Sequence, residues 1–349
     1  MKEERIIYAD ILKIFATFSV ILLHVSASKW SLVNIETFEW KVFNFYDSLV
    51  RFGVPIFVML SGMFFLKEDK NISYKKIYSK YILRIFTAFL FWSTFYSIYI
   101  NFTNYDEFSS EFANKIISDI IEGRYHLWFL FMITGLYIIT PILRKVVSND
   151  RGTTEYFLIL WFIFTVILPF VIKISNIADL DIFINKFNIH LIIGYIGYFV
   201  GGYYMETYTI NKKARKIIYF LGILGIASTV VFTDLISMRE GKANAILYGY
   251  FSPNVMITSV AVFTFFKYEV SKIRFSKSSL KIINTINSCT FGIYLVHDFF
   301  IIVLTEKGIT TMLFNPIFLI PIIVLLIFML SFIVSYIISK IPILNKYIM

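Results

Sequence analysis

Long apolar runs, separated by short polar segments, recur from one end of the chain to the other. Each run is roughly 20 residues long, the length that a helix needs to cross a hydrocarbon core about 30 Å thick. Such runs must be helical inside lipid, because every backbone polar group there needs an internal partner. We therefore expect an all-α, polytopic membrane helix bundle of about ten spans. These are predicted at residues 8–28, 46–66, 80–101, 127–143, 155–173, 189–206, 216–233, 246–266, 288–305 and 315–339.

Composition supports a membrane protein, because 58% of the residues are hydrophobic and only 16% are charged. A soluble domain has about 25% charged residues. No soluble domain or low-complexity tract interrupts the spans, so we expect one transmembrane domain over residues 1–349. The single cysteine, Cys289, excludes a disulfide framework within one chain, and we expect no metal cofactor. The histidines are His24, His126, His190 and His297.

The net charge of +10 is concentrated in alternate loops, at residues 67–84, 144–151, 212–216 and 267–281. Loops rich in lysine and arginine face the cytoplasm in multi-span proteins. An even number of spans then places both termini in the cytoplasm. The positive charge is therefore explained by membrane topology, and we expect no nucleic-acid partner.

A polar stripe runs along the first span through Asp10, Lys13, Thr17 and His24. Their spacings of 3, 4 and 7 place all four side chains on one face of a helix. Lys13 and His24 lie about 16 Å apart along the axis, with Lys13 in the cytoplasmic half. Ionisable groups exposed to lipid cost several kcal/mol, so the stripe is expected to face protein or a water-filled cavity.

Simpler explanations of the stripe stay open. Lys13 can extend to the interface and pair with Asp10, while His24 hydrogen-bonds a neighbouring helix. The segment also resembles a signal peptide, with 25–27 as a loose cleavage site, but the polar residues favour a retained helix. Taken together, the stripe favours a functional cavity. Histidine titrates near neutral pH, so His24 there can act as a general base on a hydroxyl.

Polar residues also occur in other spans. In the second span, Pro55 leaves a backbone carbonyl without its helical partner, and a packing kink is the simplest interpretation. Arg51, near the external end, either binds an anion or extends to the interface. The fourth span opens with His126 and Trp128, residue types that are common at membrane interfaces. His297, in the ninth span, lies deeper than an interfacial residue.

These segments together resemble the acyltransferase-3 family of membrane acyltransferases. The family has a basic residue and a histidine separated by ten residues in the first span, as Lys13 and His24 are. Arginine is commoner at the first position, so a point charge replaces a planar fork here. The family also has a pattern of proline, phenylalanine, serine and glycine in the second span, which this chain matches. The tyrosine that usually follows the glycine is Met63 here. The other matching positions are Pro55, Phe57, Ser61, Gly62, His126, Leu127, Trp128, Phe129, Tyr137, Pro141 and 291–297.

The resemblance covers the whole chain, and the standalone form, similar to the O-acetyltransferase of enterobacterial common antigen, fits best. It implies acyl transfer from a cytoplasmic acyl-CoA, usually acetyl-CoA, to a hydroxyl of a surface glycan or its lipid-linked precursor. His24 would then activate the hydroxyl or carry the acyl group, assisted by Lys13 and Asp10. The residues expected to contact substrates are Arg84, Arg51, Ser61, His126, Trp128, Tyr294 and His297.

Two other functions remain open from the sequence. Polar stripes and proline-interrupted spans also suit a transporter or flippase of a lipid-linked saccharide. A non-catalytic partner in a polysaccharide assembly complex would leave the polar stripe unexplained. Besides the acyl donor, the acceptor glycan and membrane lipid, the sequence indicates no partner and no oligomeric state. It also leaves the choice between acetyl and succinyl open.

Overall fold

The computed structural model describes residues 5–67, 73–102, 110–147, 150–175 and 194–349. Every regular element within these ranges is a helix, as predicted. Their bounds are α1 Ile7–Trp30, α2 Phe38–Val50, α3 Gly53–Phe65, α4 Tyr74–Lys76, η1 Ile77–Ile82, α5 Leu83–Phe102, α6 Ser110–Glu122, η2 Tyr125–Leu127, α7 Trp128–Val147, α8 Arg151–Trp161, η3 Phe162–Ile167, α9 Leu168–Ser175, α11 Ile196–Thr207, α12 Lys212–Glu240, η5 Ile246–Tyr248, α13 Pro253–Tyr268, η6 Val270–Lys272, α14 Lys277–Glu306, α15 Pro316–Ser339 and α16 Pro342–Tyr347.

Nine helical stretches within the described ranges are long and apolar enough to cross a membrane. They correspond to nine of the predicted spans, and the chain is a multi-pass membrane protein. The remaining predicted span, 189–206, is represented by α11, which has 12 residues. The first part of that prediction, together with His190, lies outside the described residues.

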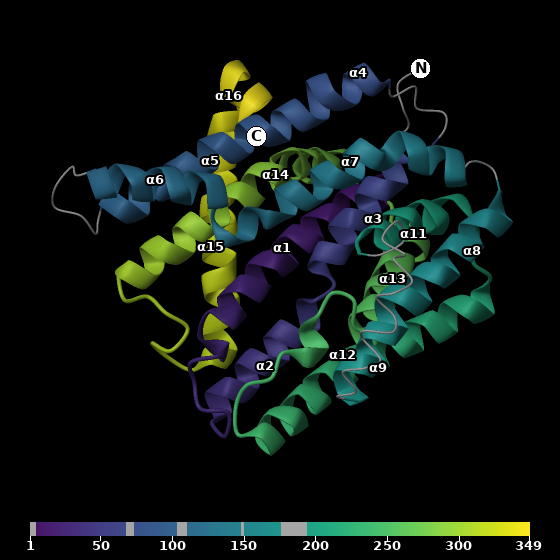
Figure 1. The fold of residues 1–349 in the computed structure, drawn as a ribbon, viewed down its shortest axis with the longest axis horizontal. Helices are drawn as coiled ribbons and strands as arrows, with labels where there is room; N and C mark the ends of the chain where they lie inside the picture. The colour runs from purple at the N-terminus through teal and green to yellow at the C-terminus, as the bar shows by residue number, and fades with distance from the viewer. Residues whose placement is uncertain (1–4, 68–72, 103–109, 148–149, 176–193) are drawn as a thin grey trace.

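Helices α1 and α3 run through the middle of the bundle, and α12 lies along its lower edge in Figure 1. In the apolar stretch that contains α3, 72% of the residues are buried, whereas in that of α12 only 22% are buried. Phe220, Leu224 and Phe232 on α12 are exposed. Because an apolar side chain is stable in contact with lipid, this exposure fits a helix on the outside of a membrane bundle.

The loops rich in lysine and arginine meet at one end of the bundle. Glu206, at the end of α11, lies 3.4 Å from Lys67 after α3 and 4.0 Å from Lys267 on α13. Lys267 also donates to the backbone carbonyls of Met205 and Glu206 at 2.6 and 2.8 Å. The hydroxyl of Tyr8 donates to Glu206, so α1 begins here as well. We call this region, marked by Lys67, Glu206 and Lys267, the basic end.

The second predicted span is broken into α2 and α3 between Val50 and Gly53. Pro55 explains the break, because it lacks a backbone N–H and its ring would collide with the carbonyl of Arg51, four residues earlier. A Cβ atom on Gly53 would lie 3.2 Å from Val20 on α1. The break therefore lets the start of α3 pack closely against α1.

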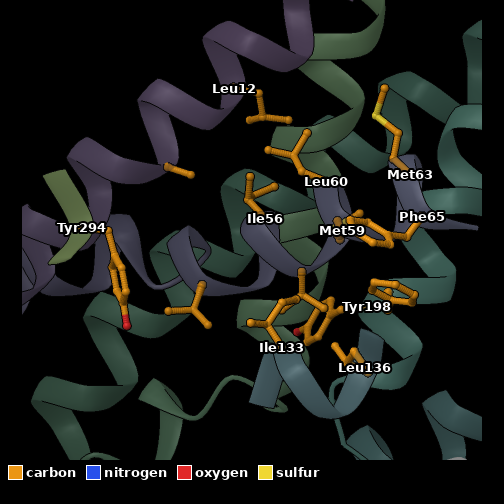
Figure 2. Close-up of a cluster of buried hydrophobic side chains, with 14 of the residues drawn as sticks. Leu12, Ile56, Met59, Leu60, Met63, Phe65, Ile133, Leu136, Tyr198 and Tyr294 are labelled. Carbon is orange, nitrogen blue, oxygen red and sulfur yellow. The ribbon is translucent and has the colours of Figure 1, made fainter. Parts of the chain in front are cut away.

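Two glycines bring α3 and α11 into backbone contact. A Cβ atom on Gly62 would lie 1.7 Å from the carbonyl oxygen of Phe199, and one on Gly202 would lie 1.8 Å from that of Met59. Around this contact, buried side chains from several helices fill the core (Figure 2), including Leu12 from α1 and further residues of α3, α7 and α11.

Replacing Gly62 with alanine is expected to destabilise the protein by about 1–3 kcal/mol, because the added methyl meets the backbone of Phe199 rather than a flexible side chain. Gly135→Ala on α7 is the matched control, since a Cβ there has no atom within 4 Å. Thermal unfolding of the two variants in detergent measures the difference. Equal unfolding temperatures would contradict the close packing of α3 on α11.

Candidate functional site

A cavity of about 500 Å³ lies among α1, α3, α5, α7 and α14. Its volume falls in the range of small-molecule sites, roughly 300–1,000 Å³. Lys13 and Arg84 line one part of it, and His24 and His126 line another. Since Lys13 and His24 are both on α1, the cavity extends along this helix for about 16 Å, from near the basic end towards the opposite end.

Seven of the ten residues predicted for the site line this cavity, and the other three do not. The seven lining residues are Lys13, His24, Ser61, Arg84, His126, Trp128 and Tyr294, and the other three are Asp10, Arg51 and His297. Thr17, which belongs to the polar stripe of α1 but was not among the ten, donates its hydroxyl to the carbonyl of Lys13 at 2.9 Å.

Three histidines from three helical segments meet at the end of the cavity away from Lys13. The ring of His24 stacks on that of His297, with centroids 5.2 Å apart, and His126 lies 5.1 Å from His297. His297 Nδ1 is 2.5 Å from the carbonyl oxygen of Tyr294. A carbonyl only accepts hydrogen bonds, so this contact places the proton on Nδ1 and leaves the lone pair on Nε2. We call this region, marked by His24, His126 and His297, the histidine end.

His24 is the most exposed of these three histidines. Its ring is half-buried, whereas those of His126 and His297 are buried. Within the ranges that the structure describes, neither ring nitrogen of His24 forms a hydrogen bond. Its other ring contact is with Tyr125, at 5.2 Å. The described neighbours thus provide no structural hydrogen bond for His24.

Asp298 is a buried carboxylate beside this cluster, and it was not among the residues predicted for the site. Arg124 Nε donates to it at 2.6 Å, and the hydroxyl of Tyr125 donates at 2.8 Å. Nδ1 of His126 lies 3.8 Å away. A carboxylate inside an apolar bundle requires such partners. That requirement was visible in the sequence, since Asp298 directly follows His297 in a predicted span.

Lys13 has no carboxylate within 4 Å among the residues that the structure describes. Asp10 instead pairs with Arg5 and accepts a hydrogen bond from Asn287 Nδ2 at 2.5 Å. The pairing of Lys13 with Asp10, one of the explanations left open by the sequence, is therefore not formed. Lys13 faces the cavity, and Asp10 holds Asn287, which also lines it.

Arg84 is the second cation of the cavity. It donates to the backbone carbonyl of Met349 and lies 5.7 Å from the ring of Phe291. The π-helical turn η1 directly precedes α5 and carries Tyr81, which lines the cavity too. Turns of this type are frequent at functional sites, because the extra residue changes the direction in which the next side chains point.

Arg51 is held by its neighbours away from the cavity. It forms an ion pair with Asp47, and its guanidinium lies 3.8 Å above the ring of Tyr248. Asp47 is fully buried. The ion pair of Arg51 is therefore formed within one turn of α2 and its C-terminal end, and the guanidinium packs against Tyr248 of η5.

The arrangement combines cations, a general base and an apolar passage. Lys13 and Arg84 provide positive charge, the histidines provide proton acceptors, and Phe57, Leu60 and Ile133 line the walls between them. Among the described residues, no three histidine, cysteine, aspartate or glutamate side chains are arranged to hold a metal ion. Such a site can bind an anionic ligand at one end and accept a proton at the other.

The helix bundle and its enclosed polar site define a multi-pass membrane protein with an internal binding cavity. The chain belongs to the acyltransferase-3 family, because the family model for its acyltransferase domain matches residues 6–340. The resemblance inferred from the sequence is thus confirmed.

Curated relatives carry a different description. A probable poly-β-1,6-N-acetyl-D-glucosamine export protein of Staphylococcus aureus, from strains MSSA476, MW2 and N315, is 23% identical over 267 residues. The match covers 73% of this chain and 71% of the relative. No solved structure matches the chain.

The ion pair between Arg124 and Asp298 is expected to stabilise the histidine end. A double-mutant cycle with Arg124→Gln and Asp298→Asn should give a coupling of about 1–3 kcal/mol, because Asp298 is buried. The control is the exposed pair Arg151–Glu155, for which the coupling should be about 0.3–0.5 kcal/mol. Thermal or chemical unfolding in detergent measures both. Equal couplings would show that Asp298 is solvated rather than dependent on Arg124.

Proposed function

We propose that this protein transfers an acyl group, most simply acetyl, from a cytoplasmic acyl-CoA to a hydroxyl of a cell-surface glycan or its lipid-linked precursor. The observation that carries the proposal is one cavity that joins two cations near the basic end to His24 at the other, a histidine with no hydrogen-bond partner among the described residues. Membership of the acyltransferase family supports the reaction class. In this proposal the basic end faces the cytoplasm, as the distribution of lysine and arginine predicts.

Lys13 and Arg84 are proposed to bind the phosphates of the acyl-CoA. A lysine binds phosphate as a point charge and an arginine through its planar fork. The reactive thioester of an acyl-CoA lies at the end of a long, thin arm, away from the phosphates. A passage of about 16 Å with apolar walls suits such an arm, because it carries the thioester from the cations towards the histidines.

His24 is proposed to accept the proton of the acceptor hydroxyl. The hydroxyl oxygen then forms a C–O bond with the thioester carbon, the C–S bond breaks, and the CoA thiolate leaves. The proton passes from His24 to the thiolate or to water. Transient acylation of His24 would use the same residue, and the CoA would then leave before the glycan attacks.

Export without chemistry is the second candidate, because the relatives in Staphylococcus aureus are described as probable export proteins. A conduit for a polysaccharide must accommodate several linked sugars in succession. The cavity of about 500 Å³ instead has the size of a site for one ligand. A half-buried histidine with no hydrogen-bond partner among the described residues also has an evident use as the base in acyl transfer.

His24→Ala is expected to abolish acyl transfer while membrane insertion and yield stay unchanged, because the residues that the structure describes form no hydrogen bond with this side chain. Ser28→Ala, one turn further along α1 and exposed, is the matched control and should retain full activity. Mass spectrometry of surface glycans from cells with each variant measures the acyl content. Normal acylation with His24→Ala would end its catalytic assignment. A loss of secreted glycan with unchanged acylation per sugar would favour export.

Lys13→Ala and Arg84→Ala are each expected to raise the KM for acyl-CoA about ten-fold to a hundred-fold, since each removes a charged hydrogen bond to phosphate. Lys13→Arg should retain most of the affinity because the charge is kept. Lys216→Ala, which removes an exposed lysine of α12, is the control. The assay is acyl-CoA consumption in reconstituted membranes. An unchanged KM in both cavity variants would place the donor elsewhere.

A further inference from the structure

We propose that Trp128, Tyr195 and Tyr250 form an aromatic platform at the histidine end of the cavity that binds a pyranose ring of the acceptor. This inference rests on the proposed function and names the part of the site that selects the acceptor. The three residues come from separate segments: the first residue of α7, the residue before α11, and the turn before α13.

The three rings pack on one another. Trp128 lies 5.6 Å from Tyr195 and 6.1 Å from Tyr250, measured between ring centroids, and its ring is within 27° of parallel to Tyr250. Tyr195 and Tyr250 are 6.2 Å apart. Trp128 and Tyr250 line the same cavity as His24. A ring bound on this platform would therefore share the cavity with the proposed base.

Trp128 differs from every other tryptophan of the chain in its exposure. The other four, Trp30, Trp40, Trp92 and Trp161, are 8% exposed or less, whereas Trp128 is 39% exposed. Tryptophan is common at membrane interfaces, where it contacts lipid headgroups. A residue with that role alone has no reason to line an internal cavity beside a histidine cluster, as Trp128 does.

The tyrosine hydroxyls indicate the chemistry of the occupant. Within the described part of the chain, neither Tyr195 nor Tyr250 uses its hydroxyl in a hydrogen bond. A phenolic hydroxyl can both donate and accept. A pyranose presents an apolar face of C–H groups and a rim of hydroxyls, so it complements an aromatic face bordered by free phenols. An acyl-CoA phosphate would instead require cations, which lie with Lys13 and Arg84 near the basic end.

The platform is tested with membranes that contain the full-length protein, labelled acetyl-CoA and the endogenous surface glycans. Trp128→Leu should lower acetyl incorporation into glycan about ten-fold, with an unchanged KM for acetyl-CoA. Trp128→Tyr keeps an aromatic face and should retain most of the incorporation. Tyr250→Leu tests the same surface independently if Trp128→Leu fails to fold. Phe314→Leu, at an aromatic residue that is 76% exposed and outside the cavity, is the control.

Each outcome decides between the alternatives. Wild-type incorporation by folded Trp128→Leu or Tyr250→Leu protein would overturn the platform and leave the acyltransferase proposal standing. A raised KM for acetyl-CoA in these variants would also overturn it, because the rings would then serve the donor. If the wild-type protein transfers no acetyl group to any glycan, the proposed function fails and the platform falls with it.

Discussion

An ionisable side chain inside an apolar helix bundle needs an opposite charge, a hydrogen bond or water. Most of the charged groups in the interior of this protein satisfy that requirement with a neighbour. Asp298 is held by Arg124 and Tyr125, and Asp47 pairs with Arg51. The contacts of Asp298 connect α14 to the segment before α7, which is distant in the sequence. They also fix the positions of the histidines and of the aromatic side chains beside them.

Lys13 and His24, both on α1, are the exceptions to this pairing, and both line the cavity. Neither has a charged or hydrogen-bonded side-chain partner among the described residues, and both line the same space. Water or a ligand must then provide their hydrogen bonds or opposite charge. The distance between them suits a donor whose charged and reactive parts are far apart. Along α1, the proposed site for the phosphates, at Lys13, is thus separate from the proposed site of proton transfer, at His24.

The sequence predicted what local patterns determine. The lengths of the apolar runs predicted the spans, Pro55 predicted a kink in the second span, where α2 and α3 are separate helices, and the spacing of Lys13 and His24 predicted a shared face. Contacts between distant segments were not accessible in this way. The partners of Asp298 could not be predicted, because Arg124 and Tyr125 lie more than 170 residues earlier in the chain and reach it only in the folded protein. The platform depends on the contact between Tyr195 and Tyr250, and no local sequence pattern predicts that these two residues lie side by side.

The central claim is that acyl groups pass through this cavity from the basic end to the histidine end. The most direct test uses sealed proteoliposomes with the protein in one defined orientation and labelled acetyl-CoA on one side only. We predict acetylation of glycan on the opposite side, only when acetyl-CoA faces the basic end, and none with His24→Ala. Acetylation confined to the side of the acetyl-CoA, or unaffected by His24→Ala, would contradict the account.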